Sequence, residues 1–162
     1  MGGVIWITGV SGTGKTTLAA GVVTALRARH AAAIHLDGDA LRAVLGREAP
    51  VDYTPEARAL LALQYARLAL LVSTQGAIAV ASVVALRHDV HRLLRERASP
   101  YVEVWLRRRE PAARHDGPAV GRELPAEYPL APDVVLDNDG PVATLPRLVD
   151  VVLAAWDRNA HG

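Results

Sequence analysis

The sequence predicts a single α/β domain, residues 1–162, built around a parallel β-sheet. Short apolar runs rich in valine and isoleucine alternate with longer stretches of helical periodicity, which is the pattern of βαβ units. A glycine-rich turn follows the first apolar run and opens the first helical stretch. The length of 162 residues suits one domain with a substantial core.

The expected strands and helices alternate along the chain. We assign the short runs rich in β-branched residues to strands and the longer amphipathic stretches between them to helices. Strands are predicted at residues 4–8, 33–36, 77–81, 101–106 and 134–136, and helices at residues 15–29, 39–46, 55–75, 86–97 and 142–158.

The helix predicted at residues 55–75 has recognisable boundaries. Thr54 before Pro55 is suited to start a helix, and Gly76 is suited to end one. Apolar residues recur at three- and four-residue spacing, so one face of this helix is expected to be buried. The residues on that expected face are Leu60, Leu63, Ala66, Leu70 and Leu71.

Residues 107–132 break the alternation of strands and helices. Prolines, two glycines and many charged residues crowd this segment. Such a composition predicts a long loop, and long loops in compact domains often carry function. We expect a short lid here, which would cover the substrate of an enzyme with this architecture.

The composition fits a folded protein and argues against several classes of function. The chain is 51% hydrophobic and 22% charged, away from the range typical of disorder. A net charge of +1 gives no support for nucleic acid or a membrane surface as a partner. With no cysteine, the chain lacks disulfides and thiolate chemistry. No signal-peptide pattern and no membrane-spanning run are present, so we expect a cytoplasmic location.

The segment GVSGTGKT, residues 9–16, matches the phosphate-binding pattern G-x-x-x-x-G-K-[ST]. Its glycines let backbone N–H groups turn towards phosphate oxygens, and the following helix adds the positive end of its dipole. Lys15 is expected to reach the β- and γ-phosphates, and the Thr16 hydroxyl is expected to bind Mg²⁺. The expected nucleotide-binding residues are Gly9, Ser11, Gly12, Thr13, Gly14, Lys15, Thr16 and Thr17.

Lys15 is the only lysine among 18 lysine and arginine residues. A coding bias towards arginine accounts for the scarcity of lysine elsewhere in the chain. At this position the chemistry requires lysine, because a phosphate loop closes around a compact ammonium and a planar guanidinium is too wide for that space.

The segment LDGDALR, residues 36–42, is the second candidate for chemistry. Ligands of parallel sheets bind at the carboxyl ends of the strands, so Asp37 and Asp39 are expected to face the same crevice as the phosphate loop. One carboxylate can hold the metal or its water, and the other can accept a proton from an attacking hydroxyl. In the alternative interpretation, Asp39 only caps the next helix and Arg42 is a solvated charge.

Several segments together resemble the adenylyl-sulfate kinase family. They are VIWITGVSGTGKTTLA, LDGDALR, YVEVWL and PDVVLDNDG, within residues 4–139. The resemblance implies a P-loop kinase fold with a five-stranded parallel sheet, and transfer of the γ-phosphoryl group of ATP to a hydroxyl with Mg²⁺. It also implies that Asp39 is the catalytic base, that Asp37 holds the metal or its water, and that Arg42 contacts an anionic group of the acceptor. ASVVALRHDVHRLLRE and AVGRELP resemble the branch containing cytidine diphosphoramidate kinase.

The acceptor side of the chain departs from that family. Where the family has an asparagine and an arginine pair, this chain has the segment LLAL at residues 60–63. The chain also contains no phenylalanine to stack on an adenine. We therefore expect a rebuilt acceptor pocket, in which Tyr53 or Tyr65 substitutes for the missing ring.

Additional arginines are candidates for anion binding. Arg87 follows the third predicted strand and is either half of an anion clamp with Arg42 or a surface charge. Residues 107–109 are three consecutive arginines, and Arg114 lies further along the expected lid. These side chains either neutralise ATP phosphates when the lid closes or remain solvated.

The combined patterns predict an ATP- and Mg²⁺-dependent kinase for a small molecule with a hydroxyl group. The expected acceptor is anionic and nucleotide-like, such as adenylyl sulfate or a cytidine diphosphate derivative. Two alternatives stay open, namely a kinase for a non-nucleotide specialised metabolite and a catalytically silent ATP-binding module that regulates a partner. We expect no nucleic-acid or membrane partner, and a homodimer is one assembly open to the chain.

Overall fold

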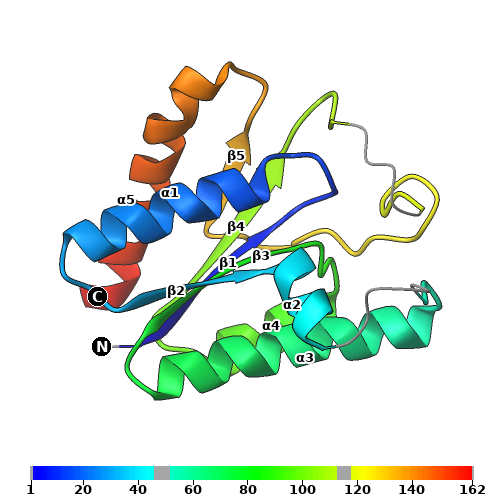
Figure 1. The fold of residues 1–162 in the computed structure, drawn as a ribbon, viewed down its shortest axis with the longest axis horizontal. Helices are drawn as coiled ribbons and strands as arrows, with labels where there is room; N and C mark the ends of the chain where they lie inside the picture. Colours follow the sequence, from blue (N-terminus) through cyan, green and yellow to red (C-terminus); the bar gives the residue numbers. More distant parts are fainter. Residues whose placement is uncertain (1, 46–51, 113–117, 162) are drawn as a thin grey trace.

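The computed structural model describes residues 2–45, 52–112 and 118–161, and it confirms the α/β class (Figure 1). Five parallel strands form one sheet in the order β2-β3-β1-β4-β5. The strands are β1 (Gly3–Thr8), β2 (Ala33–Asp37), β3 (Ile78–Val83), β4 (Tyr101–Arg107) and β5 (Val134–Asp137), and the helices are α1 (Lys15–Ala28), α2 (Gly38–Val44), α3 (Pro55–Thr74), α4 (His88–Arg97), η1 (Val142–Thr144) and α5 (Leu145–His161).

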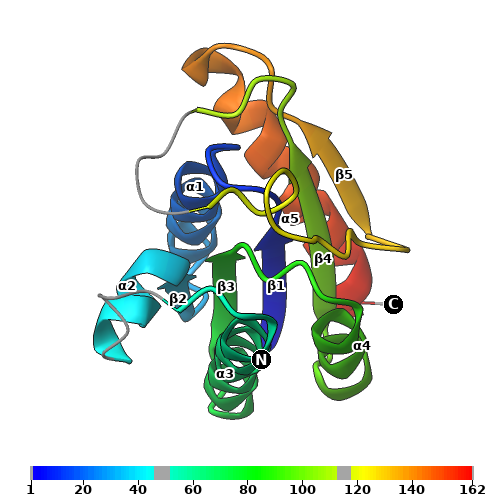
Figure 2. The same cartoon turned by 90° about the vertical axis from the view of Figure 1, so that its right-hand side faces the viewer.

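Helices cover both faces of the sheet. Helices α1 and α5 lie on one face, and α3 and α4 lie on the other (Figures 1 and 2). The central strand β1 is buried along its whole length. Its Ile5 and Ile7 belong to the core under α1 and α5, while Val4 and Trp6 belong to the core under α3 and α4. This double burial explains why the strand reads as a continuous apolar run.

The sheet has a switch point between β1 and β3. The chain leaves β1 for helix α1 on one face, and it leaves β3 for helix α4 on the opposite face (Figure 2). Adjacent strands whose following helices diverge leave a crevice at their carboxyl ends, which is where open α/β sheets bind ligands. The phosphate loop fills the turn after β1, so the topology places it in this crevice.

The ends of the predicted elements agree with the structure to within three residues, except that the helix end predicted at residue 46 lies outside the described residues. Strand β3 continues beyond the predicted end and includes Ser82. Strand β4 includes Arg107, so the loop expected from residue 107 begins one residue later. The last predicted helix begins with the 3₁₀ turn η1, and α5 follows it.

The prediction of the buried face of α3 is wrong in part. Leu60 is 44% exposed and Leu71 is 54% exposed. Apolar residues occur nearly all around this helix, so leucine spacing alone did not define the face that contacts the sheet. Small side chains allow the helix to lie against the sheet instead. The buried residues of α3 are Ala62, Tyr65, Ala66 and Ala69.

A buried ionic cluster joins α4 to β4. The Glu103 side chain is 3% exposed, and its carboxylate lies 3.1 Å from His91 Nδ1 and 2.9 Å from an Arg95 guanidinium nitrogen. Arg95 also pairs with Asp133 at 3.2 Å, and His91 Nε2 lies 2.9 Å from the carbonyl of Ala85. Burial lowers the pKa of His91 despite the opposing effect of Glu103.

Among residues 2–45, 52–112 and 118–161, no helix is long and apolar enough to cross a membrane. The same ranges contain no group of three histidine, aspartate or glutamate side chains suited to hold a metal ion.

Replacing His91 by glutamine is expected to reduce the pH dependence of stability. The ordinary pKa of 6.5 is lowered in the folded protein, so the unfolded chain binds more protons as the pH falls below this value. The free energy of unfolding should therefore be highest above pH 6.5. It should decrease as the pH falls below 6.5, and His91 should contribute at most about 1.4 kcal/mol per pH unit to this decrease. Urea unfolding between pH 7.5 and 5.5 measures this loss, with His161→Gln as an exposed control. An unchanged slope in the His91→Gln protein would contradict this role of burial.

Candidate functional site

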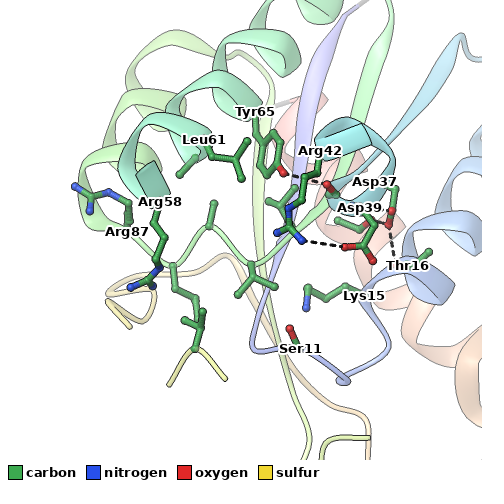
Figure 3. A pocket seen from close by; sticks show the side chains of 18 of the residues that line it. Ser11, Lys15, Thr16, Asp37, Asp39, Arg42, Arg58, Leu61, Tyr65 and Arg87 are labelled. Carbon is green, nitrogen blue, oxygen red and sulfur yellow. Dashed lines mark hydrogen bonds and ion pairs between the residues drawn. The ribbon is translucent and has the colours of Figure 1, made fainter. Parts of the chain in front are cut away.

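A cavity of about 320 Å³ opens at the switch point of the sheet (Figure 3). The phosphate loop and the end of β2 form one side of it, and α3 and the turn after β3 form the other. Pro118 and Val120 of the expected lid also line the cavity. Five chain segments that are distant in sequence therefore meet around one space.

The phosphate loop has the backbone geometry that its sequence predicts. Gly14 has a φ of 96°, and a Cβ atom there would lie 2.6 Å from Asn138 Nδ2, so only glycine fits without strain. Lys15 is 8% exposed, and its Nζ donates a hydrogen bond of 2.7 Å to the carbonyl of Val10. The ammonium group is thus held inside the loop, at the edge of the cavity.

Asn138 supports the phosphate loop from behind and was not identified from the sequence. Its Nδ2 donates to the carbonyl of Thr13 at 2.8 Å, and its backbone N–H donates to the carbonyl of Arg107 at 2.8 Å. The residue follows β5, whereas the loop follows β1. Nothing in the local sequence signals this contact, because it depends on the order of the strands.

Asp37 accepts four hydrogen bonds at the end of β2. Its Oδ2 accepts from the hydroxyls of Thr16 at 2.7 Å and Ser82 at 2.9 Å. Its Oδ1 accepts from the backbone N–H groups of Asp39 and Ala40 at the start of α2. Partial burial favours a raised pKa, but these hydrogen bonds outweigh burial and lower the pKa of Asp37 below its ordinary value. The carboxylate is therefore charged at neutral pH.

Asp39 faces the cavity from the first turn of α2 and is 53% exposed. An Arg42 guanidinium nitrogen lies 3.7 Å from its Oδ1. The Tyr65 hydroxyl donates to the carbonyl of Gly38 at 3.0 Å, which holds the ring against this turn. Asp39 is thus an accessible carboxylate beside a cation, close to the phosphate loop (Figure 3). The helix cap is Asp37, so the alternative interpretation of Asp39 as the cap is wrong.

Two arginines line the opposite end of the cavity (Figure 3). Arg58 of α3 donates to the carbonyl of Pro125 at 2.8 Å. Partial burial is the larger cause that lowers the pKa of Arg58, and the positive charge of Arg87 is the smaller one. Arg87 itself forms a two-point ion pair with Asp89, at 3.0 and 2.8 Å. Arg87 was expected here, but Arg58 was missed because it lies within a helix that reads mainly as apolar.

The expected lid folds back over the cavity. The backbone N–H of Glu127 donates to the carbonyl of Leu86 at 3.0 Å, and its carboxylate accepts from the backbone N–H of His88 at 2.7 Å. The Tyr128 ring lies 5.4 Å from the ring of Trp105. These contacts join the segment after residue 118 to the turn after β3, which lines the cavity, and to β4.

The arginine run at the end of β4 is partly paired within the protein. Arg107 forms a two-point ion pair with Asp137, at 2.8 and 2.9 Å. Arg109 lies 3.3 Å from the carboxylate of Asp139. Arg114 lies outside the described residues.

The donor set at Thr16 and Asp37 fits a magnesium ion. Oxygen ligands suit Mg²⁺, and both side chains meet at 2.7 Å beside the phosphate loop. Because the Thr16 proton points to Asp37, a lone pair of the same hydroxyl remains for a metal. Thr16 and Asp37 would together hold the ion, with Asp37 binding either the metal or its water.

Comparisons with known proteins agree on one family. A sequence model described as adenylylsulphate kinase matches residues 1–116. The adenylyl-sulfate kinase of Paraburkholderia xenovorans is 35% identical over 156 residues, covering 85% of this chain and 84% of that protein. The cytidine diphosphoramidate kinase of Campylobacter jejuni is 30% identical over 103 residues, covering 64% of this chain and 59% of that protein.

A solved structure confirms the fold. The APS kinase of Mycobacterium tuberculosis, in complex with AMPPNP and APS, superposes with a TM-score of 0.78. The alignment covers 96% of this chain and 98% of that chain, at 22% sequence identity. This likeness shows the P-loop kinase fold that the sequence motifs imply.

Replacing Lys15 by arginine is expected to abolish nucleotide turnover without unfolding the protein. The ammonium lies inside the loop, and a guanidinium cannot occupy the same space while donating to the Val10 carbonyl. We expect the rate of ADP formation to fall by at least about 100-fold, the scale of lost electrostatic stabilisation. Circular dichroism should report an unchanged fold. Near-normal turnover in this variant would contradict the assigned role of Lys15.

Proposed function

The chain belongs to the adenylylsulphate kinase family and is an ATP-dependent phosphotransferase, and from this premise we propose that it phosphorylates a hydroxyl of an anionic, nucleotide-like acceptor. The single observation that carries the proposal is that Lys15 and Thr16 share one cavity with Asp37 and Asp39 (Figure 3). A phosphate site and an accessible carboxylate at the same crevice suit phosphoryl transfer.

The phosphate donor is ATP, held by the phosphate loop. We assign the loop residues from Gly9 to Thr17 to the triphosphate, with Lys15 beside the β- and γ-phosphates. Thr16 and Asp37 would hold Mg²⁺, which when bound neutralises charge on the phosphate oxygens. Arg114 is proposed as a further contact to ATP by its place in the expected lid.

Asp39 is the proposed catalytic base. Its carboxylate is exposed to the cavity, so an acceptor hydroxyl can donate a hydrogen bond to it. Arg42 lies beside it, with a guanidinium nitrogen 3.7 Å from Asp39 Oδ1. Asp39 would orient the hydroxyl towards the γ-phosphate and accept its proton as the new bond forms.

Three arginines are proposed to bind the anionic part of the acceptor. Arg42, Arg58 and Arg87 all line the cavity. Arg42 Nε is buried without a hydrogen-bond partner among the described residues, and a bound anion would satisfy it. Adenylyl sulfate and a cytidine diphosphate derivative are the candidate acceptors, because relatives of the chain are named for such substrates.

A non-nucleotide metabolite is the second candidate acceptor. The wall between the two ends of the cavity is aliphatic and includes Leu61, Ala62 and Val84. Of the described lining residues, only Tyr53 and Tyr65 carry aromatic rings, and the Tyr65 hydroxyl donates to the carbonyl of Gly38. This wall favours an acceptor with an apolar body over a strongly hydrogen-bonding one.

We propose that the whole chain acts as one kinase domain with residues 108–132 as its lid, since Arg107 belongs to β4. The contact between Glu127 and the turn at Leu86 supports this role.

A homodimer is the proposed assembly, and size-exclusion chromatography with light scattering tests it.

An acceptor screen tests the proposed function. Purified protein with ATP and Mg²⁺ is offered adenylyl sulfate, cytidine diphosphate derivatives, sugars and hydroxy acids. ADP release is followed, with mass spectrometry of any product that gains one phosphate. We expect turnover with an anionic acceptor. No ADP release from the whole panel would contradict the kinase assignment and favour an ATP-binding regulatory module.

Replacing Asp39 by asparagine is expected to separate binding from chemistry. The amide cannot accept the proton, so turnover should fall by about 10²- to 10⁴-fold. The affinity for ATP should change little, because Asp39 is not assigned to the nucleotide. Asp157→Asn, at the exposed end of α5, is the matched control and should keep full activity. Equal rates in the parent and Asp39→Asn proteins would rule out Asp39 as the base.

A further inference from the structure

Two side chains lie behind Asp37 and complete a chain of hydrogen bonds. The Ser82 hydroxyl donates to Asp37 Oδ2 at 2.9 Å, and His35 Nε2 lies 2.9 Å from the Ser82 Oγ. Ser82 is 3% exposed, and His35 is half-buried. Neither residue was identified from the sequence, because His35 lies inside a predicted strand and Ser82 was placed beyond the end of another.

The register of two strands brings these residues together. Asp37 of β2 is paired with Ser82 of β3 in the parallel register. His35 precedes Asp37 by two positions, so both side chains project from the same face of β2. That face is the one covered by α1, whose first turn carries Thr16. The chain from His35 to Thr16 thus follows directly from strand pairing.

The direction of each hydrogen bond can be assigned by counting protons. Ser82 has one hydroxyl proton, and Asp37 is charged and has none to donate. The Ser82 proton therefore goes to Asp37. His35 Nε2 must then carry the proton that it shares with Ser82 Oγ. The donors run in one direction, from His35 to Ser82 and from Ser82 to Asp37.

We propose that His35 and Ser82 are positioning residues that hold the Asp37 carboxylate towards Thr16 and so set the affinity of the site for the magnesium of bound ATP. The inference rests on the proposed function, since it takes Thr16 and Asp37 as the magnesium site. Asp37 is partly exposed, so hydrogen bonds and not packing fix its orientation. Side chains that do not touch a metal can still change its affinity, because they orient the groups that bind it.

Substitutions of His35 and Ser82 test the proposal by binding, without turnover. Titration calorimetry measures the affinity for ATP with Mg²⁺ and with EDTA, in the parent and in Ser82→Ala and His35→Leu. We expect the affinity for MgATP to fall by about 10-fold, at the lower end of such effects. The affinity for metal-free ATP should stay unchanged, because the phosphate loop is not altered.

A conservative variant and a matched control separate positioning from structural support. In His35→Gln the amide N–H can still donate to Ser82, so the preference for MgATP should be retained. Ile34→Ala alters an exposed neighbour on the same edge strand and should also leave this preference unchanged. Thermal unfolding of each variant confirms that it is folded before binding is measured.

Three results would overturn the proposal. The first is an equal loss of affinity for MgATP and for metal-free ATP in Ser82→Ala and His35→Leu. The second is no loss of affinity for MgATP in either variant. The third is a His35→Gln protein whose affinity for MgATP falls as much as that of His35→Leu. Failure of the proposed function looks different, because then the parent protein itself would bind ATP without any preference for Mg²⁺ or would show no turnover in the acceptor screen. If the parent protein prefers MgATP and turns over, but the variants keep the same preference, the result contradicts only the positioning role of His35 and Ser82.

Discussion

The arrangement of the crevice depends on the hydrogen bonds that the Asp37 carboxylate accepts. These hydrogen bonds join Thr16 of α1, Ser82 of β3 and the first turn of α2. These elements are distant in sequence, and together they carry the phosphate site and Asp39. One charged group therefore fixes the donor side of the cavity relative to the acceptor side. Without it, α2 would lose its cap and the buried Ser82 hydroxyl would lose its acceptor.

Much of this arrangement could be predicted from local sequence. A strand, a glycine-rich turn and a helix occur in direct succession at residues 4–29, so the phosphate loop and Lys15 were identified with their structural context. Asp37 and Asp39 were placed at the crevice because the end of a parallel strand dictates where they lie. In each case the functional side chain sits within a few residues of a recognisable strand end, so its position depends on local structure.

The remainder of the site depends on contacts between distant segments. Arg58 lies in a helix whose leucines suggested a different buried face, so only the packed structure shows that it reaches the cavity. Asn138 supports the phosphate loop because β5 and β1 share one sheet. Ser82 and His35 meet because of the register between β2 and β3. Strand order and register are set by packing of the whole domain, so they cannot be predicted from the sequence of any short segment.

In the proposed reaction, the phosphate donor and the acceptor meet in a single crevice, and the phosphoryl group passes directly between them. Lys15 and Asp39 line the same cavity, and no side chain is assigned to carry the phosphoryl group. The most direct measurement is the stereochemical course at phosphorus, with ATP made chiral at the γ-position and the acceptor found by screening. Direct in-line transfer predicts inversion of configuration. Retention would reveal a phosphorylated protein intermediate and contradict this account.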